Sequence, residues 1–326
     1  MNADVICLRP EADFTRVGVA VPGTLNVAYR APDDGELPSL MKAARALVIP
    51  AVGPKLVPTL FDGARLELIQ VTGAGVDRLD RESIERRGIP VANVPGGSNA
   101  ALAEYATAAA ATLTRRLAWA SHEIRAGNYA TFRARLLADN VGGLEGLTVG
   151  IIGFGVVGMA VAEAFHRQGC AIVFHDPVPA DPARAEAIGA KQMDLPALLA
   201  AADVVSLHVP LVPATRGLIG TAELKRMKPG AILIQASRGG VVDEAALAEA
   251  LRAGTLGGAA VDVYTSEPPT PDNPLLALSG EAAERILLTP HIAGVTRQAS
   301  AYLFRSAWQN VERVLLEGRP PLSRVY

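Results

Sequence analysis

Short apolar runs alternate with longer segments of mixed apolar and polar residues along the whole chain. The runs are rich in Val, Ile, Leu and Ala, which is typical of strands buried on both faces of a parallel sheet. The segments between the runs have helical character, and this alternation predicts an α/β protein with parallel sheets. The predicted strands are Val5–Leu8, Leu25–Tyr29, Ala46–Ile49, Leu66–Val71, Val91–Asn93, Thr148–Ile152, Ile172–His175, Val204–His208, Ala231–Gln235, Ala259–Val263 and Ile286–Leu288.

The predicted strands form two series that are separated by a long alanine-rich segment. Ala100–Arg125 has strong helix propensity and few turn residues, so it predicts one long helix near the junction of two units. The length of 326 residues agrees with two domains. The composition of the last predicted helix leaves open whether that helix packs on the first unit. The other predicted helices are Leu37–Arg45, Arg81–Arg87, Ala160–Gln168, Asp243–Ala253 and Gln298–Glu317.

The charge balance removes several classes of function. The chain has 31 Lys and Arg against 33 Asp and Glu, a formal net charge of -2. Nucleic-acid binders and polybasic membrane-surface proteins normally carry a basic excess. Two cysteines are too few for a disulfide framework or a structural zinc site. We therefore expect no nucleic-acid partner, no membrane association and no metal.

The first residues and one apolar segment bear on the location of the protein. The N-terminus contains acids and lacks the basic start and apolar core of a signal peptide, which favours a cytoplasmic protein. Residues 146–162 form a run of 17 residues without a charge, whereas a transmembrane helix needs about 20 apolar residues. Glycines interrupt this run, so it predicts a strand, a tight turn and a helix instead.

The glycine-rich turn inside this run has the spacing of a dinucleotide-binding loop. Its sequence is GFGVVG, with Gly153, Gly155 and Gly158 after a predicted strand and before a predicted helix. In such a loop the first glycine permits the tight turn, and the second lets the backbone approach a pyrophosphate. The third lets the helix pack closely on the strand. The pyrophosphate would then lie on the free N–H groups of the helix N-terminus.

An aspartate ends the next predicted strand. Asp176 lies 23 residues after Gly153, at a position where a carboxylate would hold the adenosine ribose hydroxyls. A carboxylate there also repels a 2′-phosphate, and the next arginine in the sequence is Arg184. These residues predict NAD rather than NADP as the preferred cofactor. The alternative is a glycine turn followed by an unrelated surface aspartate.

Three later residues follow predicted strands and could carry chemistry. Arg238, Glu267 and His291 each come just after a strand, and Asp262 lies within one. Ligands of open parallel sheets bind at the carboxyl ends of the strands, so these side chains could converge on one site. Singly, each also fits a structural role: a solvated loop cation, a surface acid before a proline turn, or a buried histidine bonded to backbone.

Together the three side chains suit the reduction of a carbonyl group. A guanidinium binds a carboxylate through two parallel hydrogen bonds and polarises a neighbouring carbonyl. A histidine donates a proton to the carbonyl oxygen as hydride arrives, and accepts it in the reverse direction. A carboxylate orients the imidazole and favours its protonated form. Arg238, Glu267 and His291 would thus reduce a 2-keto acid to a 2-hydroxy acid.

Several ordered motifs resemble those of the D-isomer-specific 2-hydroxyacid dehydrogenases, a family that includes hydroxypyruvate and glyoxylate reductases and phosphoglycerate dehydrogenases. The resemblance extends from about Leu47 to Leu315. TGAGVD matches the family's substrate-domain glycine loop, and NVPGGSNAALAEYA matches the segment that enters a long connecting helix. GFGVVG, SLHVPL, SRGGVVDEAAL, VDVYTSEPP and TPHIAG follow in the family's order.

The resemblance implies a discontinuous α/β fold with its active site in a cleft between two domains. Residues 1–99 and 294–326 would form a flavodoxin-like substrate domain. Residues 100–293 would form an inserted Rossmann domain that binds NAD. The resemblance also implies that the protein forms a homodimer through its cofactor domains.

The same resemblance implies roles for individual residues. Backbone N–H groups at Ala74, Gly75 and Val76 would bind the substrate carboxylate beside Arg238, and Asp262 would hold the nicotinamide carboxamide. The implied cofactor contacts are Gly153, Gly155, Val156, Val157, Gly158, Asp176, His208, Val209, Pro210, Thr215, Ala236, Ser237, Asp262, His291 and Gly294.

Departures from the family's patterns bear on the substrate. Phosphoglycerate dehydrogenases of the family usually carry an arginine after the third strand, where this chain has Pro50 and Ala51. Formate dehydrogenases of the group have glutamine in place of Glu267. Arg297 adds a cation near the implied cleft mouth, where it could contact an anionic substrate tail. We therefore expect a small 2-keto acid, such as glyoxylate, hydroxypyruvate or a lactate-like substrate.

Two alternative functions stay open from the sequence. An NAD(H)-sensing binding protein of the same fold would use cofactor-dependent dimerisation, although this chain carries the whole set of catalytic residues. A relative that oxidises a different small anion, such as phosphite, would use the same arginine, glutamate and histidine.

Overall fold

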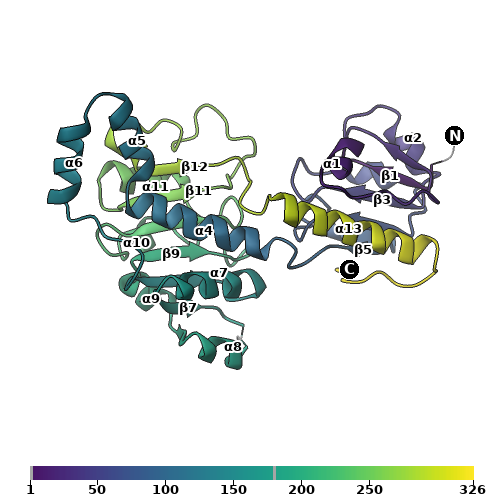
Figure 1. The fold of residues 1–326 in the computed structure, drawn as a ribbon. Helices are drawn as coiled ribbons and strands as arrows, with labels where there is room; N and C mark the ends of the chain where they lie inside the picture. Colours follow the sequence, from purple (N-terminus) through teal and green to yellow (C-terminus); the bar gives the residue numbers. More distant parts are fainter. Residues whose placement is uncertain (1–2, 179–180) are drawn as a thin grey trace. The chain divides into compact units, whose positions relative to one another are not determined.

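The chain folds into two compact units, each built around a parallel sheet (Figure 1). The computed structural model describes residues 3–178 and 181–326. The first unit contains Met1–Ser98 and Val295–Tyr326, and the second contains Asn99–Gly294. These divisions lie one residue from the boundaries that the family resemblance implies, and the second unit interrupts the first.

The first unit has five strands in the order β2-β1-β3-β4-β5, all parallel. This order is that of flavodoxin-like sheets. The strands are β1 (Val5–Cys7), β2 (Val27–Tyr29), β3 (Ala46–Ile49), β4 (Leu68–Val71) and β5 (Val91–Ala92). The helices are α1 (Glu11–Arg16), α2 (Leu37–Met41), the short 3₁₀ turn η1 (Pro58–Phe61), α3 (Arg81–Arg86) and α13 (Arg297–Leu315).

The second unit has seven strands in the order β12-β11-β10-β9-β6-β7-β8. The chain reverses its direction of strand addition between β6 and β9, as in the Rossmann fold. The strands are β6 (Thr148–Ile152), β7 (Ala171–His175), β8 (Lys191–Gln192), β9 (Val204–Leu207), β10 (Ile232–Gln235), β11 (Gly258–Val261) and β12 (Ile286–Leu288). The helices are α4 (Asn99–Thr114), α5 (Leu117–Arg125), α6 (Tyr129–Ala138), α7 (Val156–Arg167), α8 (Pro182–Ala187), α9 (Leu195–Ala201), α10 (Thr221–Leu224), α11 (Glu244–Arg252) and α12 (Glu281–Glu284).

Alternate side chains of the central strands enter two different cores. In β9, Val204 packs into the core that contains α4 and α7, whereas Val205 and Leu207 pack into the core on the opposite face. The same alternation divides β3, in which Leu47 and Val48 enter different cores of the first unit. Burial of both sheet faces explains why these strands are continuous apolar runs in the sequence.

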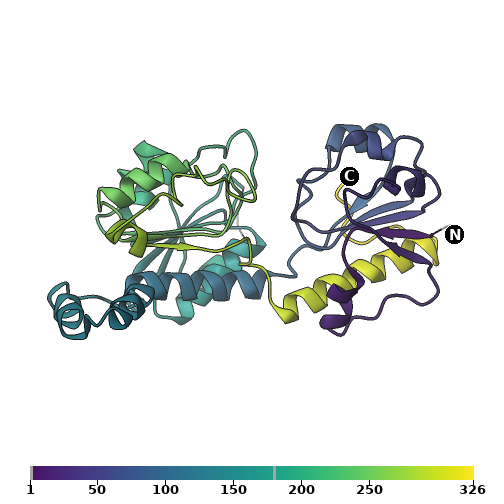
Figure 2. The ribbon, with the colours of Figure 1, turned by 90° about the horizontal axis from the view of Figure 1, so that it is seen from above.

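The last helix, α13, belongs to the first unit, a point that composition left open. Its side chains Phe304, Trp308 and Val311 are buried on the sheet face that also holds Phe14, and Figure 2 shows the helix along that face. The chain then forms a short antiparallel bridge between Arg324 and Ala92 of β5. The two ends of the sequence are therefore joined in one core.

The expected long helix over residues 100–125 is wrong as a single element. The helix ends at Thr114, and Arg116 adopts a left-handed conformation with φ 53° before α5 begins. A left-handed backbone costs roughly 1–2 kcal/mol for a residue other than glycine. The break allows Trp119 to pack on Phe132 of α6 with ring centroids 5.3 Å apart, and both rings are buried. Burial of these aromatic rings offsets the cost of the turn.

The described residues also bear on membranes and metals. None of the helices in residues 3–178 and 181–326 is long and apolar enough to cross a membrane. Over the same residues, no three His, Cys, Asp or Glu side chains gather where they could hold a metal ion.

A buried polar pair links α13 to the central strand β4. Asn310 donates through Nδ2 to Gln70 Oε1 at 2.9 Å and to the Leu322 carbonyl at 3.0 Å. Its Oδ1 accepts from the Leu322 N–H at 2.9 Å. Both side chains are almost fully buried. The pair therefore fixes the register of the helix and of the C-terminal segment on the sheet.

The Asn310→Ala substitution is expected to lower the free energy of unfolding by about 1–3 kcal/mol, because it leaves the buried Gln70 amide oxygen without its donor and releases the Leu322 backbone. Urea unfolding followed by tryptophan fluorescence in a Trp119→Phe background measures this, since Trp308 of the first unit is then the only tryptophan. Gln309→Ala, at an exposed position of the same helix, is the control, with a change within about 0.5 kcal/mol. An equally small change for Asn310→Ala would contradict the role of the pair.

Candidate active site

The glycine loop after β6 is built for close backbone approaches. Gly153 has φ 90°, and a Cβ atom there would lie 2.5 Å from the His208 carbonyl oxygen. A Cβ atom on Gly158 would lie 1.9 Å from the Gly153 carbonyl oxygen, so only glycine lets α7 pack this closely. A Cβ atom on Gly155 would meet nothing within 4 Å. The loop thus has no room for a side chain at Gly153 or Gly158 but leaves open space at Gly155.

The open side of this loop faces the N-terminus of α7. Val156 and Val157 are the first residues of this 12-residue helix, with Gly155 as its N-cap. Their N–H groups and that of Gly158 have no partner within the helix, because the first turn of any helix lacks acceptors. The N-terminus also carries the positive end of the helix dipole. These features fit the pyrophosphate of a dinucleotide, as the sequence predicted.

Asp176 ties the end of β7 to the glycine loop. Its Oδ2 accepts a hydrogen bond from the Phe154 N–H at 2.6 Å, and its Oδ1 accepts from the Val178 N–H at 2.8 Å. Each carboxylate oxygen keeps capacity for a further donor. Asp176 also lines an open pocket of about 480 Å³ with His175, Gln192, Met193 and Asp194.

This pocket carries two carboxylates, and no lysine or arginine is among the described residues that line it. Asp194, which the sequence reasoning missed, caps α9 through the Ala197 N–H and lies in the pocket with Asp176. Arg184, the arginine that follows Asp176 in the sequence, pairs with Glu163 at 2.6 Å. The pocket can therefore accept ribose hydroxyls and repels an additional phosphate.

The neighbouring strands β10, β11 and β12 end at the same level of the sheet. Gln235 of β10 pairs in register with Val261 of β11, and Val261 pairs with Leu288 of β12. Neighbouring strands lie about 4.8 Å apart, so the residues that follow these ends meet at one edge. The residues that the sequence singled out, Arg238, Glu267 and His291, all come after these three ends.

The imidazole of His291 and the carboxylate of Glu267 form a direct pair. His291 Nδ1 lies 2.8 Å from Glu267 Oε2, and Glu267 Oε1 accepts from the Tyr264 N–H at 3.0 Å. Both side chains are partly exposed, at 26% and 29%. Since Nδ1 faces the carboxylate, Nε2 is the ring nitrogen left for a reacting group.

The environment of Glu267 keeps its carboxyl group ionised. Partial burial raises the pKa of this group, but the hydrogen bonds from His291 and Tyr264 and the charges of His291 and Arg238 outweigh burial. The pKa of Glu267 therefore lies below its ordinary value. An ionised carboxylate at Nδ1 favours the protonated imidazole and fixes its orientation.

The turn that carries His291 is held by Asp262. The Asp262 carboxylate accepts hydrogen bonds from Thr289 Oγ1 at 2.6 Å, Ile292 N–H at 2.8 Å and Ala293 N–H at 2.8 Å. The His291 N–H donates to the Asp262 carbonyl at 2.9 Å. His291 is held in this way at φ 54°, a conformation that is strained for histidine.

The position of Asp262 corrects one sequence expectation. Asp262 was expected within a strand, but β11 ends at Val261 and Asp262 is the first residue beyond it. Its side chain is 1% exposed. Three protein donors already occupy the carboxylate, with Oδ2 accepting only one of them. A contact to a nicotinamide carboxamide stays a prediction for that oxygen.

Arg238 lies in a turn that is organised by Gln235. The Gln235 amide donates to the Arg238 carbonyl at 2.8 Å, and its oxygen accepts from Ser237 Oγ at 2.7 Å. Arg238 Nη1 donates to the Ser237 carbonyl at 2.8 Å. A Cβ atom on Gly239 would lie 1.8 Å from the Tyr264 carbonyl oxygen, so this turn packs directly on the backbone that leads to Glu267. Gln235 was read from the sequence only as the end of a strand.

His208 follows β9 and lies against the glycine loop. Burial lowers its pKa to about 4, so the imidazole is neutral at pH 7. Its Nε2 lies 2.8 Å from Ser206 Oγ. Its Nδ1 is buried and finds no hydrogen-bond partner among the described residues. Val209 also borders the loop, because a Cβ atom on Gly153 would lie 2.8 Å from its side chain.

The remaining predicted cofactor contacts lie in turns at the same edge. Thr215 Oγ1 donates to the Pro210 carbonyl at 2.6 Å and accepts from the Val212 N–H at 2.9 Å, so the hydroxyl closes its own turn. Ala236 precedes the turn of Arg238, and Gly294 follows the turn of His291. Both residues are half-buried. Their cofactor contacts stay predictions.

The predicted substrate loop lies in the first unit, after β4. Ala74 is exposed, Gly75 and Val76 are half-buried, and Asn93 Nδ2 donates to the Ala74 carbonyl at 2.6 Å. A Cβ atom on Gly73 would lie 2.7 Å from the Cβ atom of Ala51, in the loop after β3, which explains why a glycine begins this turn.

Arg78, just after this loop, is a basic residue that sequence reasoning missed. Its side chain is 3% exposed and donates to the Pro54 and Pro50 carbonyls at 2.8 and 3.1 Å. Burial lowers its pKa. Arg78 thus braces the loop after β3. Arg297, which the sequence placed near a cleft mouth, is the exposed first residue of α13.

Comparison with known proteins agrees with this geometry. Residues 107–293 match the family model described as D-isomer specific 2-hydroxyacid dehydrogenase, NAD binding domain. The chain is 42% identical over 234 residues to a D-3-phosphoglycerate dehydrogenase of Archaeoglobus fulgidus, which covers 72% of this chain and 42% of that protein. The chain thus spans less than half the length of that relative.

Two further proteins are similar over most of their length. A glyoxylate reductase of Aeropyrum pernix is 36% identical, over 77% of this chain and 74% of that protein. The crystal structure of the TT0316 protein from Thermus thermophilus superposes with a TM-score of 0.83 at 33% identity, over 99% of both chains. The resemblance that the motifs indicated is therefore confirmed, as is the α/β fold with a Rossmann domain. This chain belongs to the D-isomer-specific 2-hydroxyacid dehydrogenase family, and its second unit contains the family's NAD-binding domain.

Proposed function

We propose that this protein interconverts a small 2-keto acid and a D-2-hydroxy acid by NAD-dependent hydride transfer. The observation that carries the proposal is the hydrogen bond of 2.8 Å between His291 Nδ1 and Glu267 Oε2. This pair lies on the same sheet edge as Arg238, in a unit whose glycine loop fits NAD. The family membership of the chain supports the same reaction.

The reaction needs a proton, a hydride and a fixed substrate. NAD, when bound, supplies or accepts the hydride. His291 gives its Nε2 proton to the substrate carbonyl oxygen in reduction and takes it back in oxidation, while Glu267 stabilises the imidazolium. Arg238 binds the substrate carboxylate and polarises the adjacent carbonyl. The substrate contacts of Ala74, Gly75 and Val76, which lie in the first unit, stay predictions.

The proposed substrate is a small acid, such as glyoxylate, hydroxypyruvate or a lactate-like acid. Pro50 and Ala51 stand where phosphoglycerate dehydrogenases usually have an arginine, and the buried Arg78 donates to the carbonyls of Pro50 and Pro54. A similar protein bears the name glyoxylate reductase. These features favour a substrate with one carboxylate and no phosphate.

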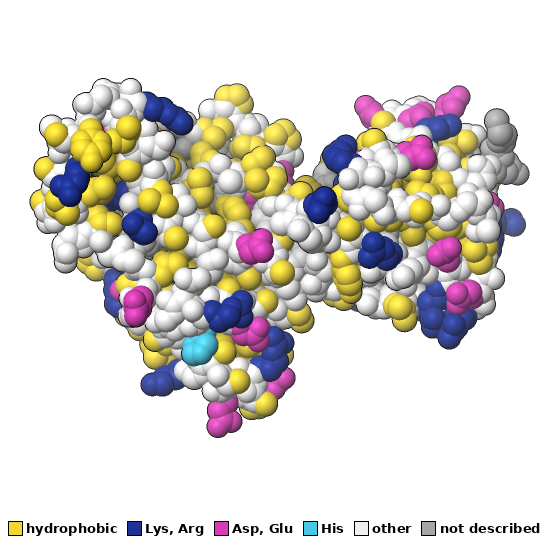
Figure 3. All heavy atoms as spheres, viewed as in Figure 1, with side chains coloured by type: hydrophobic (Ala, Val, Ile, Leu, Met, Phe, Trp, Pro, Cys, Tyr) yellow, Lys and Arg dark blue, Asp and Glu magenta, His cyan; other side chains and the backbone are white. Residues whose placement is uncertain are grey.

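The protein is further proposed to act as a cytoplasmic homodimer. Exposed apolar side chains gather on α5 and α6, namely Leu117, Ile124, Tyr129 and Leu137, and Figure 3 shows apolar surface over these helices. An apolar patch of this kind is suited to contact with a second copy of the chain. The family resemblance implied an interface through the same unit.

Replacement of His291 is expected to slow hydride transfer strongly while NADH still binds. His291→Asn suits the left-handed backbone, which asparagine tolerates, and removes the proton donor. We expect kcat for the best 2-keto acid to fall by about 10²–10⁴-fold, with the Kd for NADH unchanged within about twofold. Stopped-flow turnover and NADH fluorescence titration measure the two quantities. Turnover close to the wild-type rate would exclude His291 as the acid/base.

Replacement of Glu267 by glutamine should change the pH profile of reduction. The lowered pKa of Glu267 means that its charge is present near neutral pH and is lost only as the pH falls through that lowered value. Without this charge the proton-donating form of the imidazole loses the carboxylate that favours it. The alkaline limb of kcat/KM should therefore move to lower pH in Glu267→Gln. A limb at the wild-type pH would argue against the pair.

The two carboxylates of the ribose pocket should determine the choice between NADH and NADPH. We expect the wild-type kcat/KM ratio to favour NADH by at least tenfold, about 1.4 kcal/mol. The double variant Asp176→Asn and Asp194→Asn keeps the hydrogen bonds to Phe154 and Ala197 but removes both charges. Its ratio should fall toward one. A wild-type enzyme that prefers NADPH would overturn the interpretation of Asp176.

A further inference from the structure

The segment that carries Glu267 has no regular secondary structure of its own. It runs from Tyr264 to Leu275, between β11 and α12. Its first turn contains the Tyr264 N–H that donates to Glu267 Oε1. A catalytic carboxylate on such a segment needs support from a rigid element, because loops alone hold side chains loosely.

The support comes from Glu244, the first residue of α11. Its Oε1 accepts from the Thr265 N–H at 2.6 Å, two residues before Glu267. Its Oε2 accepts from Asn273 Nδ2 at 2.6 Å, near the far end of the segment. One carboxylate thus clamps both ends of the loop to the helix.

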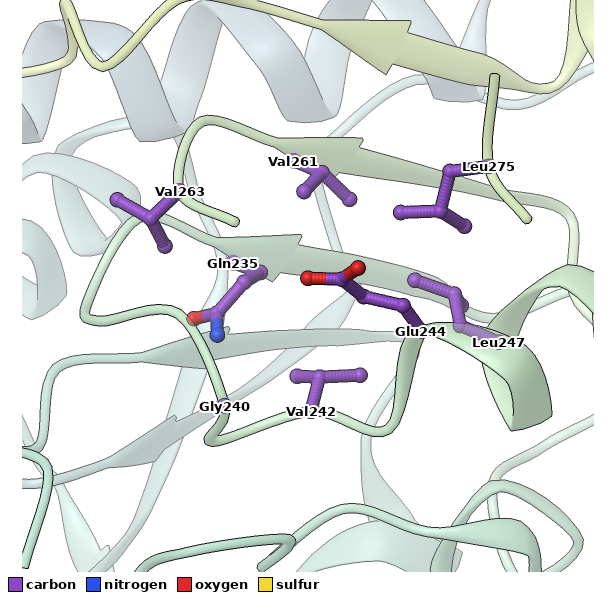
Figure 4. Close-up of a pocket in the computed structure, with 8 residues that line it drawn as sticks. All are labelled: Gln235, Gly240, Val242, Glu244, Leu247, Val261, Val263 and Leu275. Atoms are coloured by element: carbon purple, nitrogen blue, oxygen red, sulfur yellow. The ribbon is translucent and has the colours of Figure 1, made fainter. Parts of the chain in front are cut away.

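The surroundings of this clamp are mostly apolar. Figure 4 shows the Glu244 carboxylate among the side chains of Val242, Val261 and Leu275, next to Gln235. Hydrogen bonds to an ionised group are shorter and stronger than neutral ones, and a low local dielectric strengthens them further. Asn273 is 7% exposed, and its Oδ1 is occupied by the Leu275 N–H at 2.9 Å.

We propose that Glu244, through Thr265 and Asn273, is a positioning residue that holds Glu267 against His291. The proposal rests on the function assigned above to Glu267 and His291. Glu244 touches no reacting atom, and its effect passes through the backbone of the loop. The family resemblance attached no role to Glu244 or Asn273, and Glu244 was predicted only as part of the helix Asp243–Ala253.

The hydrogen-bond pattern requires a carboxylate at one end of the clamp and an amide at the other. Glutamine at position 244 can accept from Thr265, but it then turns its NH₂ group toward the NH₂ group of Asn273. Asn273 cannot flip without losing its bond to Leu275. Aspartate at position 273 can accept from both Leu275 and the new glutamine. The swapped pair Glu244→Gln with Asn273→Asp therefore restores every bond and the net charge.

The experiment is the full cycle of Glu244→Gln, Asn273→Asp and the double variant. We expect Glu244→Gln to lower kcat by about tenfold, a part of the 10²–10⁴ that proton transfer supplies, with the KM for NADH within about twofold. Its alkaline limb should move to lower pH, as in Glu267→Gln. Asn273→Asp alone should be impaired as well, because two carboxylates then face each other. The double variant should return to within about threefold of wild type.

A matched control lies on the same helix. Glu249 is exposed, and its side chain pairs only with Arg252, one turn later, among the described residues. Glu249→Gln carries the same chemical change and should leave kcat and the pH profile at their wild-type values.

A second readout does not depend on turnover. The chain has five histidines, and the ¹⁵N signals of the His291 ring can be assigned by their loss in His291→Asn. The Nδ1 signal should lose its hydrogen-bonded shift in Glu244→Gln and regain it in the double variant. If the wild-type protein reduced no 2-keto acid, the proposed function would be wrong. The Nδ1 signal would still show whether Glu244 positions Glu267 against His291. A pH profile and an Nδ1 signal that stay unchanged in Glu244→Gln, even with a lowered Tm, would overturn the proposal.

Discussion

The Asp262 carboxylate accepts three hydrogen bonds from the segment Thr289–Ala293 and is 1% exposed. A buried charge is very costly unless donors surround it. Each of these donors comes from the turn that carries His291, so the turn has little freedom to take another shape. The left-handed backbone of His291 is therefore maintained by Asp262, whose buried carboxylate needs hydrogen-bond donors.

The turns that carry Arg238 and Glu267 are also held by buried polar groups. Gln235 satisfies its buried amide on the backbone of Ser237 and Arg238, and Gly239 lets that turn pack on the Tyr264 carbonyl. Glu244 satisfies its carboxylate on both ends of the Glu267 segment. Three turns that follow three different strands are thus connected by polar groups that must find partners. The arrangement of Arg238, Glu267 and His291 at this edge depends on this network.

The glycine loop follows a different principle, that of backbone proximity. His208 and the helix α7 approach so closely that any Cβ atom on Gly153 or Gly158 would collide with a carbonyl oxygen. Such contacts occur at the point where strand order reverses between β6 and β9. This point is where open parallel sheets leave room for a ligand. The neutral imidazole of His208 adds a buried polar surface beside the loop.

Local sequence patterns were enough to predict most strands and to single out the candidate residues that follow their ends. The ranges Ala46–Ile49, Thr148–Ile152 and Ile286–Leu288 agree with the structure residue for residue. The first two are buried along almost their whole length, and strands buried on both faces must be apolar throughout. The glycine spacing and the polar residues after strand ends are also local features. The short strand β8, with its exposed Lys191 and Gln192, carries no such apolar signal and was missed.

The remaining features depend on contacts between distant parts of the chain. Asp262 meets donors some 30 residues away, Glu244 meets Asn273 at a separation of 29, and Asn310 meets Gln70 at a separation of 240. The break at Arg116 likewise depends on the packing of Trp119 against Phe132. The sequence by itself determined which segments are buried and which polar residues follow the strand ends. The tertiary structure decided how those residues are held, because a buried polar group is satisfied only by a partner that folding brings to it.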